Sequence, residues 1–208
     1  MAEPDAYGSI KRLGEAWVKA LRLGKIARLW NIYGPEPLAP HRRSHVLADW
    51  AAACVRQGGI DSLTDGAELR QFVHSADCAA GLGAAMRHYD QLELVTDVTA
   101  PVWRSMRQVA AAFQPYCPVR FAATQAAPRS MLQPRTECDF HRLWWKPDIS
   151  MEEGVAGLIQ YYRDMQRDQQ RQQEQSQSQQ DESRLLVPSP SQPPLPDLAL
   201  SAPLKEDL

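Results

Sequence analysis

The sequence predicts an α/β fold whose sheet is incomplete. Apolar residues recur at helical spacing in several segments, and short apolar runs of strand length separate these segments. The run at residues 26–30 is apolar on both faces, which is the pattern of a parallel strand covered on both sides. Such a strand needs neighbours, and the rest of the chain supplies few of them.

A helix is expected first, at about residues 5–23. Ile10, Leu13 and Trp17 belong to one stripe at helical spacing that should face the core, and Gly24 stands where a C-terminal cap is expected. Ser150 and Glu153 form a capping box for the last helix. After the strand at 26–30, the pattern predicts a helix at 45–57 closed by Gly58, a strand near 69–74, a helix at 76–88, a strand at 92–98, a helix beginning at Pro101, a strand at 119–122 and a helix at 151–167.

The composition changes after Arg167. Gln-rich sequence gives way to Ser- and Pro-rich sequence with too few large apolar groups to offset the entropy of ordering. We therefore expect a folded region at 1–167 and a disordered tail at 168–208.

Composition and charge exclude several classes of protein. The net charge of −2 does not suggest electrostatic capture of nucleic acid or of a membrane surface. We expect neither a signal peptide, because residues 1–5 are acidic and poor in apolar groups, nor a membrane span. Cys54, Cys78, Cys117 and Cys138 lack metal-site spacing, so reduced thiols in a cytoplasmic protein are the expectation.

Tyr7 and Lys11 form a Tyr-x-x-x-Lys pair on the first predicted helix. Residues at i and i+4 share one helical face, so the Lys11 ammonium can favour the ionised form of the Tyr7 phenol. A tyrosine needs such help to exchange protons at neutral pH, because its ordinary pKa is about 10. The alternative is a half-exposed tyrosine beside a solvated lysine.

Four motifs follow one another in an order that resembles a known family. They are Tyr7-Gly-Ser-Ile-Lys11, Asn31-Ile-Tyr-Gly-Pro35, Arg70-Gln-Phe-Val-His74 and Leu143-Trp-Trp-Lys-Pro147 with the segment to Gly154. Together they resemble the C-terminal half of an extended short-chain dehydrogenase/reductase, in the nucleotide-sugar epimerase and dehydratase family. The resemblance covers about residues 7–163 and implies the last strands of a Rossmann-type fold with a mainly helical substrate domain.

The resemblance assigns roles to four residues. Tyr7 would be the general acid and base at a sugar hydroxyl, and Lys11 would lower the pKa of Tyr7 and contact the nicotinamide ribose of NAD or NADP. Asn31 would contact the phosphates of a nucleotide-diphosphate sugar, although an asparagine at a strand end also commonly satisfies a turn. Arg70 would contact the nucleotide diphosphate or ribose, which suits its bidentate fork of donors, although a surface arginine in a short strand is also unremarkable.

Other motif positions point to structural roles or depart from the pattern. His74 is expected to be a packed, hydrogen-bonded residue, and Asp77 to cap the helix that follows. Trp145 matches a structural tryptophan of the family, whereas Gln71 stands where an acid is usual and Trp144 where a glycine is usual.

A Gly-x-x-Gly-x-x-Gly loop, which cradles the NAD pyrophosphate in this family, is missing. We therefore expect that the chain does not hold NAD or NADP by itself. Three explanations stay open: a substrate-side half that works with a separate dinucleotide-binding half, an inactive remnant that serves as a protein-interaction module, and an incorrectly assigned start codon. Homo-oligomerisation is also open. An isomerase or a lyase reaction would fit, with epimerisation as the simplest.

Overall fold

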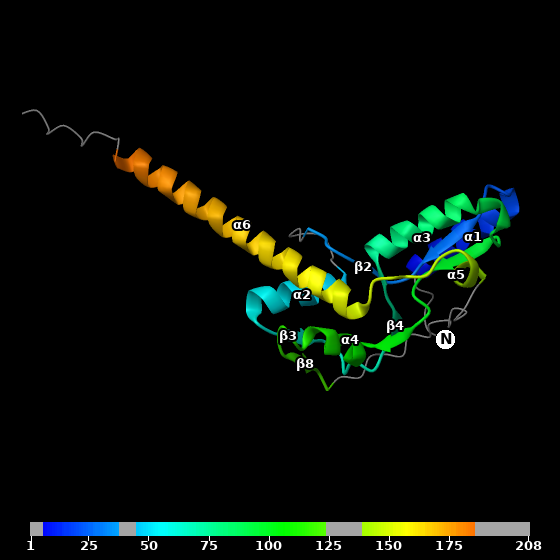
Figure 1. The fold of residues 1–208 in the computed structure, drawn as a ribbon, viewed down its shortest axis with the longest axis horizontal. Coiled ribbons are helices and arrows are strands. Elements are labelled where there is room, and N and C mark those ends of the chain that lie inside the picture. The colour runs from blue at the N-terminus through cyan, green and yellow to red at the C-terminus, as the bar shows by residue number, and fades with distance from the viewer. Residues whose placement is uncertain (1–5, 38–44, 124–138, 186–208) are drawn as a thin grey trace, which may run out of the picture. The chain divides into compact units, whose positions relative to one another are not determined.

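The structure is a computed structural model that describes residues 6–37, 45–123 and 139–185 (Figure 1). The chain divides into two compact units, residues 1–166 and 167–208, which we describe separately. The first unit alternates helices with short strands and contains the buried core. The α/β prediction is therefore confirmed.

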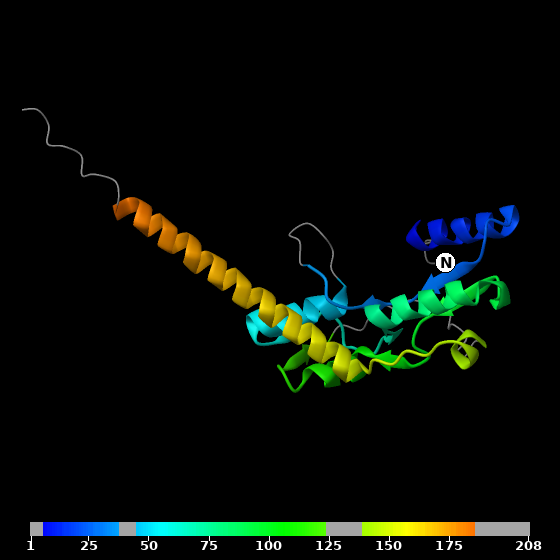
Figure 2. The ribbon, with the colours of Figure 1, turned by 45° about the horizontal axis from the view of Figure 1, so that its top comes forward.

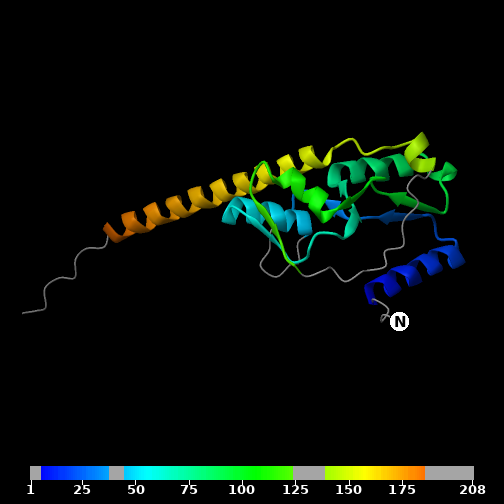
Figure 3. The same cartoon turned by 90° about the horizontal axis from the view of Figure 1, so that it is seen from below.

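Helix α1 (Ala6–Leu21) precedes strand β1 (Ile26–Leu29), which pairs in parallel with β6 (Val95–Val98). Helices α1 and α3 (Ser75–Arg87) lie on opposite sides of this strand pair (Figures 2 and 3). β1 has one hydrogen-bonded neighbour within the described residues, and three of its four residues are exposed. The sequence predicted that this strand is buried on both faces. Within the described residues it is instead an exposed edge strand.

The expectation that α1 buries an apolar stripe is wrong. The helix has no buried residue, and its apolar residues are among the most exposed of their kind. The Glu15 carboxylate instead joins α1 to β1 by accepting two hydrogen bonds, each 2.8 Å, from the Arg28 guanidinium. The exposed apolar face of α1 consists of Tyr7, Ile10, Leu13, Trp17 and Leu21.

Three further two-stranded sheets follow. β2 (Ile32–Tyr33) pairs in parallel with β5 (Val73–His74), and β3 (Ile60–Ser62) pairs in parallel with β8 (Val119–Phe121). β4 (Leu69–Gln71) is antiparallel to β7 (Trp103–Ser105). The sheets are short because each strand of these pairs has only two or three residues.

The larger core cluster joins α2 (Val46–Gln57), α4 (Met106–Phe113) and the first turns of α6 (Met151–Leu185). Gly58 ends α2 in the left-handed conformation, with φ of 68°, as its position after the apolar run predicted. The Ser150–Glu153 capping box at the start of α6 is also confirmed. The remaining helical elements are a 3₁₀ helix at Tyr89–Gln91 and α5 (Asp139–Leu143).

A second core cluster contains Trp145, which the sequence predicted to be structural. Its indole contacts the ring of Phe140 at a centroid distance of 5.6 Å. A methyl group on Gly81 would lie 2.9 Å from the same indole, so only glycine fits there without displacing the tryptophan. The prediction for Trp145 is confirmed.

The helix predicted to begin at Pro101 starts later. β7 occupies residues 103–105, and Ser105 caps α4 in a second capping box, which Gln108 completes. The sequence Ser105-x-x-Gln108 contains this signal, and it outweighs the helix-start preference of proline.

Residues 168–185 are helical, contrary to the expectation of disorder that began at 168. α6 continues to Leu185, and the side chains of residues 167–179 are solvent-exposed or nearly so. Residues 186–208 lie outside the described residues. Among the segments that are described, no helix combines the length and apolar character that a membrane span requires.

The expectation of four reduced thiols is also wrong. Cys54 at the end of α2 and Cys117 after α4 form a disulfide, with their Cα atoms 5.7 Å apart. Cys78 is free and buried, and Cys138 lies outside the described residues. The bond links two segments that are 63 residues apart in the sequence.

Candidate functional site

Tyr7 and Lys11 are neighbours on α1, as their spacing predicted. The Lys11 Nζ lies 5.4 Å from the centroid of the Tyr7 ring, a cation–π contact. The Tyr7 side chain is 68% exposed. The pair is therefore assembled at the surface of the described part of the chain.

Asn31 follows the carboxyl end of β1, the end at which open α/β sheets bind their ligands. Its side-chain Nδ2 donates a hydrogen bond of 2.9 Å to the backbone oxygen of Gln71. Asn31 thus joins the β1 end to β4 through a hydrogen bond that spans 40 residues, rather than through a local turn. The Nδ2 group of Asn31 therefore already donates one hydrogen bond within the fold.

Arg70 stands directly opposite Arg104 in the antiparallel β4–β7 pair. Opposite residues in such a pair project from the same face of the sheet, so two guanidinium groups share one side of it. Both side chains are partly buried. The sequence named Arg70 and missed Arg104, because the strand register that joins them cannot be read from local patterns.

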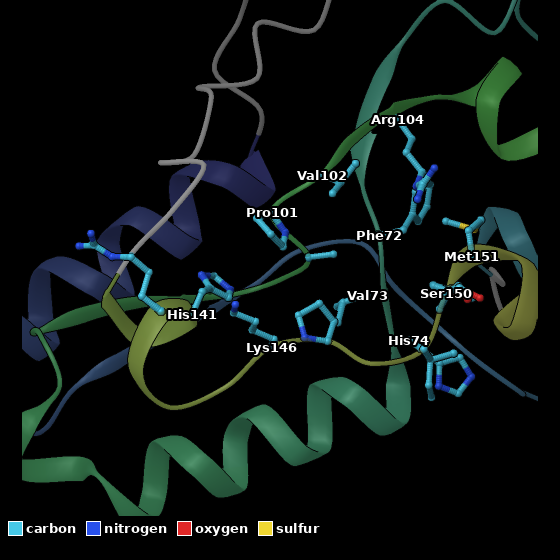
Figure 4. A pocket seen from close by; sticks show the side chains of 15 residues that line it. Phe72, Val73, His74, Pro101, Val102, Arg104, His141, Lys146, Ser150 and Met151 are labelled. Carbon is cyan, nitrogen blue, oxygen red and sulfur yellow. Dashed lines mark hydrogen bonds between the residues drawn. The ribbon is translucent and has the colours of Figure 1, made fainter.

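A cavity of about 360 Å³ adjoins this strand pair (Figure 4). Its walls come from three segments: the end of β4 with β5, the connection from β6 to β7, and the residues that lead into α6. The volume falls in the range typical of small-molecule sites. The lining side chains that carry chemistry are Tyr33, His74, Arg104, His141, Arg142 and Lys146.

The described residues that line the cavity carry cationic groups but no carboxylate. The cationic groups are those of Arg104, Arg142 and Lys146. Burial raises the pKa of Tyr33 to about 12, the charge of Asp77 adds to this rise, and Arg104 partly opposes it. The Tyr33 phenol is therefore neutral at physiological pH.

Asp77 holds the segment that leads into α6 rather than capping its own helix. Its carboxylate accepts hydrogen bonds from the backbone N–H groups of Asp148 and Ile149, at 3.1 and 2.9 Å. The cap of α3 is His74, whose Nδ1 accepts from the backbone of Ala76 at 3.3 Å. The expectation for Asp77 was wrong, and the structural role expected of His74 is confirmed.

His141 and Tyr33 are fixed by backbone contacts. The His141 Nε2 lies 2.8 Å from the backbone oxygen of Thr99, and both residues are buried. The Tyr33 hydroxyl donates to the backbone oxygen of Ser150 at 3.5 Å. These contacts hold the β6–β7 connection and the start of α6 against the cavity.

The structure brings together only part of the predicted site. Asn31 meets β4 and Arg70 lies opposite a cavity residue, but Tyr7, Lys11, Asn31 and Arg70 are not among the residues that line the cavity. Arg104, His141 and Lys146 are site candidates that the sequence did not reveal. The only sequence signal for Lys146 was its place in the Leu-Trp-Trp-Lys-Pro motif.

The described residues do not fit the pyrophosphate of a dinucleotide. A cradle of this kind needs a glycine turn between a parallel strand and the N-terminus of a helix. The glycines with positive φ, Gly24, Gly58 and Gly66, lie instead after α1, after α2 and before β4. In the same described segments, no group of three or more His, Cys, Asp or Glu side chains is arranged to hold a metal ion.

Comparison with known proteins supports the resemblance. Residues 2–100 match the sequence profile of the NAD dependent epimerase/dehydratase family. A curated relative, UDP-glucuronic acid decarboxylase 1 of Arabidopsis thaliana, is 24% identical over 170 residues, which are 78% of this chain and 39% of the relative. The chain thus spans about two fifths of that protein.

Solved structures share the fold. A UDP-glucose 4-epimerase from Thermotoga maritima, solved with UDP-glucose, superposes with a TM-score of 0.59 at 19% identity, over 76% of this chain and 53% of that one. A UDP-glucuronic acid 4-epimerase from Bacillus cereus, solved with UDP-glucuronic acid and NAD, gives 0.58 at 16% identity, over 74% and 50%. The profile match and the curated relative agree with the shared fold of these structures, and the chain is similar to the NAD-dependent epimerase/dehydratase family.

Proposed function

We propose that this chain forms the substrate side of an NAD(P)-dependent nucleotide-sugar epimerase or dehydratase, with Tyr7 as its acid–base residue. The observation that carries the proposal is the contact between Tyr7 and Lys11 on α1, inside the segment that matches the family profile. A phenol held beside an ammonium group is an arrangement suited to proton exchange with a sugar hydroxyl.

Asn31 and Arg70 would bind the diphosphate of the nucleotide sugar. Asn31 stands at the carboxyl end of β1, and Arg70 presents a fork of donors on the β4–β7 pair. The connection between the Asn31 amide and Gln71 fixes the relation of these two groups.

The nicotinamide cofactor would be held by a separate dinucleotide-binding half. The described residues lack a pyrophosphate cradle, while β1 has an unpaired edge and α1 an exposed apolar face within the described region. These are the surfaces that the missing strands and helices of such a half would cover. A homo-oligomer would also bury the β1 edge or the exposed apolar face of α1.

The decisive experiment combines the full chain with a candidate dinucleotide-binding half, NAD and a panel of nucleotide-diphosphate sugars. We expect turnover only in the combination, with epimerisation as the first reaction to assay. Tyr7→Phe should abolish turnover and leave sugar-nucleotide binding nearly intact, whereas Arg70→Ala should weaken binding. Tyr89→Phe is the matched control, because the Tyr89 ring also lies near a lysine, with Lys25 Nζ 5.0 Å from its centroid.

Two outcomes would contradict the proposal. Turnover that survives Tyr7→Phe would exclude the acid–base role of Tyr7. One-to-one binding of NAD(H) by the isolated chain at micromolar concentration, measured by calorimetry, would show that a separate cofactor half is not required.

A non-catalytic interaction module is the second candidate. The observation that favours it is the exposed apolar face of α1, a surface that monomeric proteins rarely present. This candidate predicts no turnover and no sugar-nucleotide binding with any dinucleotide-binding half, so the same assay separates the two.

A further inference from the structure

Four side chains of α1 stand four residues apart along the helix. They are Tyr7, Lys11, Glu15 and Lys19. Residues at i and i+4 are neighbours on a helix surface, so Lys11 has two possible partners, the ring of Tyr7 on one side and the carboxylate of Glu15 on the other. The Lys11 Nζ lies 5.4 Å from the centroid of the Tyr7 ring. The structure therefore shows Lys11 with Tyr7 rather than with Glu15.

Arg28 on β1 occupies the Glu15 carboxylate. The Arg28 Nε and Nη2 each donate to one carboxylate oxygen at 2.8 Å, which makes a bidentate pair. Within the described residues, Arg28 and Lys19 are the ion-pair partners of Glu15, and Lys11 is not among them. The hydrogen bonds from Arg28 lower the pKa of the Glu15 carboxyl, so this group is charged at neutral pH and its charge is already compensated.

A Glu15 carboxylate without Arg28 would compete with the Tyr7 ring for Lys11. An exposed cation–π contact and an ion pair between residues i and i+4 of a helix are both weak and of similar strength. Lys19 makes one long contact, at 3.8 Å, and would leave the other carboxylate oxygen open. The position of Lys11 over the Tyr7 ring therefore depends on whether Glu15 is already paired.

We propose that Arg28 is a positioning residue for the Tyr7–Lys11 pair: by binding both oxygens of Glu15, it leaves Lys11 to the Tyr7 ring. This inference rests on the proposed function and adds to it a residue that lies outside α1. The same bidentate pair attaches α1 to the sheet, because the helix has no buried residue of its own. Arg28 thus couples the attachment of the helix to the partner that Lys11 takes.

The test measures the contact itself by nuclear magnetic resonance on the full chain, which has five lysines. With lysine labelled at Cε, the Hε protons of Lys11 should be shifted upfield by the Tyr7 ring, and Tyr7→Leu should remove this shift and so identify the signal. Lys25, whose Nζ lies 5.0 Å from the centroid of the Tyr89 ring, is the internal reference that these variants should leave unchanged.

Arg28→Gln should reduce the Lys11 shift by roughly one third to one half, because Glu15 then competes for the ammonium with similar strength. Glu15→Gln/Arg28→Gln should restore the parent shift, because the competing carboxylate is gone. Glu15→Gln alone should keep the shift. Lys19→Gln should keep it too, and is the matched control for loss of an exposed cation beside the same carboxylate.

A role of Arg28 in attaching α1 alone predicts a different pattern. Both single variants and the double variant would then break the same link between helix and strand and would change the Lys11 shift alike. That pattern, or an unchanged shift in Arg28→Gln, overturns the inference. Arg28→Lys keeps the charge and should keep most of the shift, so a loss as large as in Arg28→Gln also counts against it. Circular dichroism of each variant checks that α1 remains helical.

Failure of the inference differs from failure of the proposed function, because the shift is measured without substrate or turnover. When the chain is combined with a dinucleotide-binding half, kcat should fall in Arg28→Gln by the same third to half, KM for the sugar nucleotide should stay unchanged, and the double variant should recover. A parent value of kcat alongside a reduced Lys11 shift overturns the positioning role and keeps the proposed function. Turnover that survives Tyr7→Phe overturns both.

Discussion

The Asp77 carboxylate accepts the backbone N–H of Ile149 at 2.9 Å, across 72 residues of sequence. A second hydrogen bond, from the N–H of Asp148, uses the other carboxylate oxygen. One buried acid on α3 therefore holds the segment that carries Lys146 and leads into α6.

Removal of this carboxylate should destabilise the fold. Asp77→Ala leaves two backbone donors without their partner, which we expect to cost about 2 kcal/mol of unfolding free energy. Asp77→Asn keeps one acceptor oxygen and should cost less. Urea denaturation measures the change, and Asp90→Ala, an exposed acid, is the control expected to stay within about 0.5 kcal/mol of the parent. An equal cost for both alanine variants would contradict the anchoring role.

Two glycines of α6 should respond to alanine with opposite signs. A Cβ on Gly154 would lie 2.2 Å from the Tyr33 hydroxyl, whereas nothing lies within 4 Å of one on Gly157. Gly154→Ala should therefore cost about 1–3 kcal/mol through overpacking, and Gly157→Ala should stabilise by up to about 1 kcal/mol through helix propensity. Chemical denaturation of both variants measures this. Tyr33→Phe in the Gly154→Ala background removes the clashing oxygen and should recover part of the loss; no recovery would place the clash elsewhere.

The disulfide should contribute strongly to stability. A bond that closes a loop of 63 residues restricts the unfolded chain by roughly 4 kcal/mol. Reduction should lower the denaturation midpoint of the parent and have no such effect on a Cys54→Ser/Cys117→Ser double variant. Thiol titration of the unfolded chain should find two fewer thiols without reductant than with it. Four free thiols in protein from cells would instead favour the reducing cytoplasmic setting that the sequence suggested.

Alkaline pH should unfold the core through its tyrosines. Burial raises the pKa values of Tyr33 and Tyr162 to about 12. The folded state therefore retains protons that the unfolded state loses above about pH 10, so stability is unaffected below pH 10 and falls between pH 10 and 12. Absorbance at the tyrosinate band should show a late titration step, and Tyr162→Phe should reduce its amplitude. A late step whose amplitude is the same in Tyr162→Phe and in the parent would contradict the burial effect on Tyr162.

Local signals were readable in the sequence, and distant pairings were not. Gly58 and the Ser150–Glu153 box set the ends of α2 and α6 through contacts within a few residues. The partners of Asp77 and Cys54 lie 71 and 63 residues away, so neither the anchor nor the disulfide has a local pattern. Arg104 became a site candidate only through its register with Arg70.

The exposure of Tyr7 links its chemistry to assembly. Water screens the field of Lys11, so an interaction of about 1 kcal/mol at 4 Å in water grows severalfold in a less polar surrounding. A protein that covers the apolar face of α1 would displace this water and sharpen the effect of the ammonium on the phenol. Assembly on this face would therefore decide whether Lys11 acts on Tyr7 through water or across a dry contact.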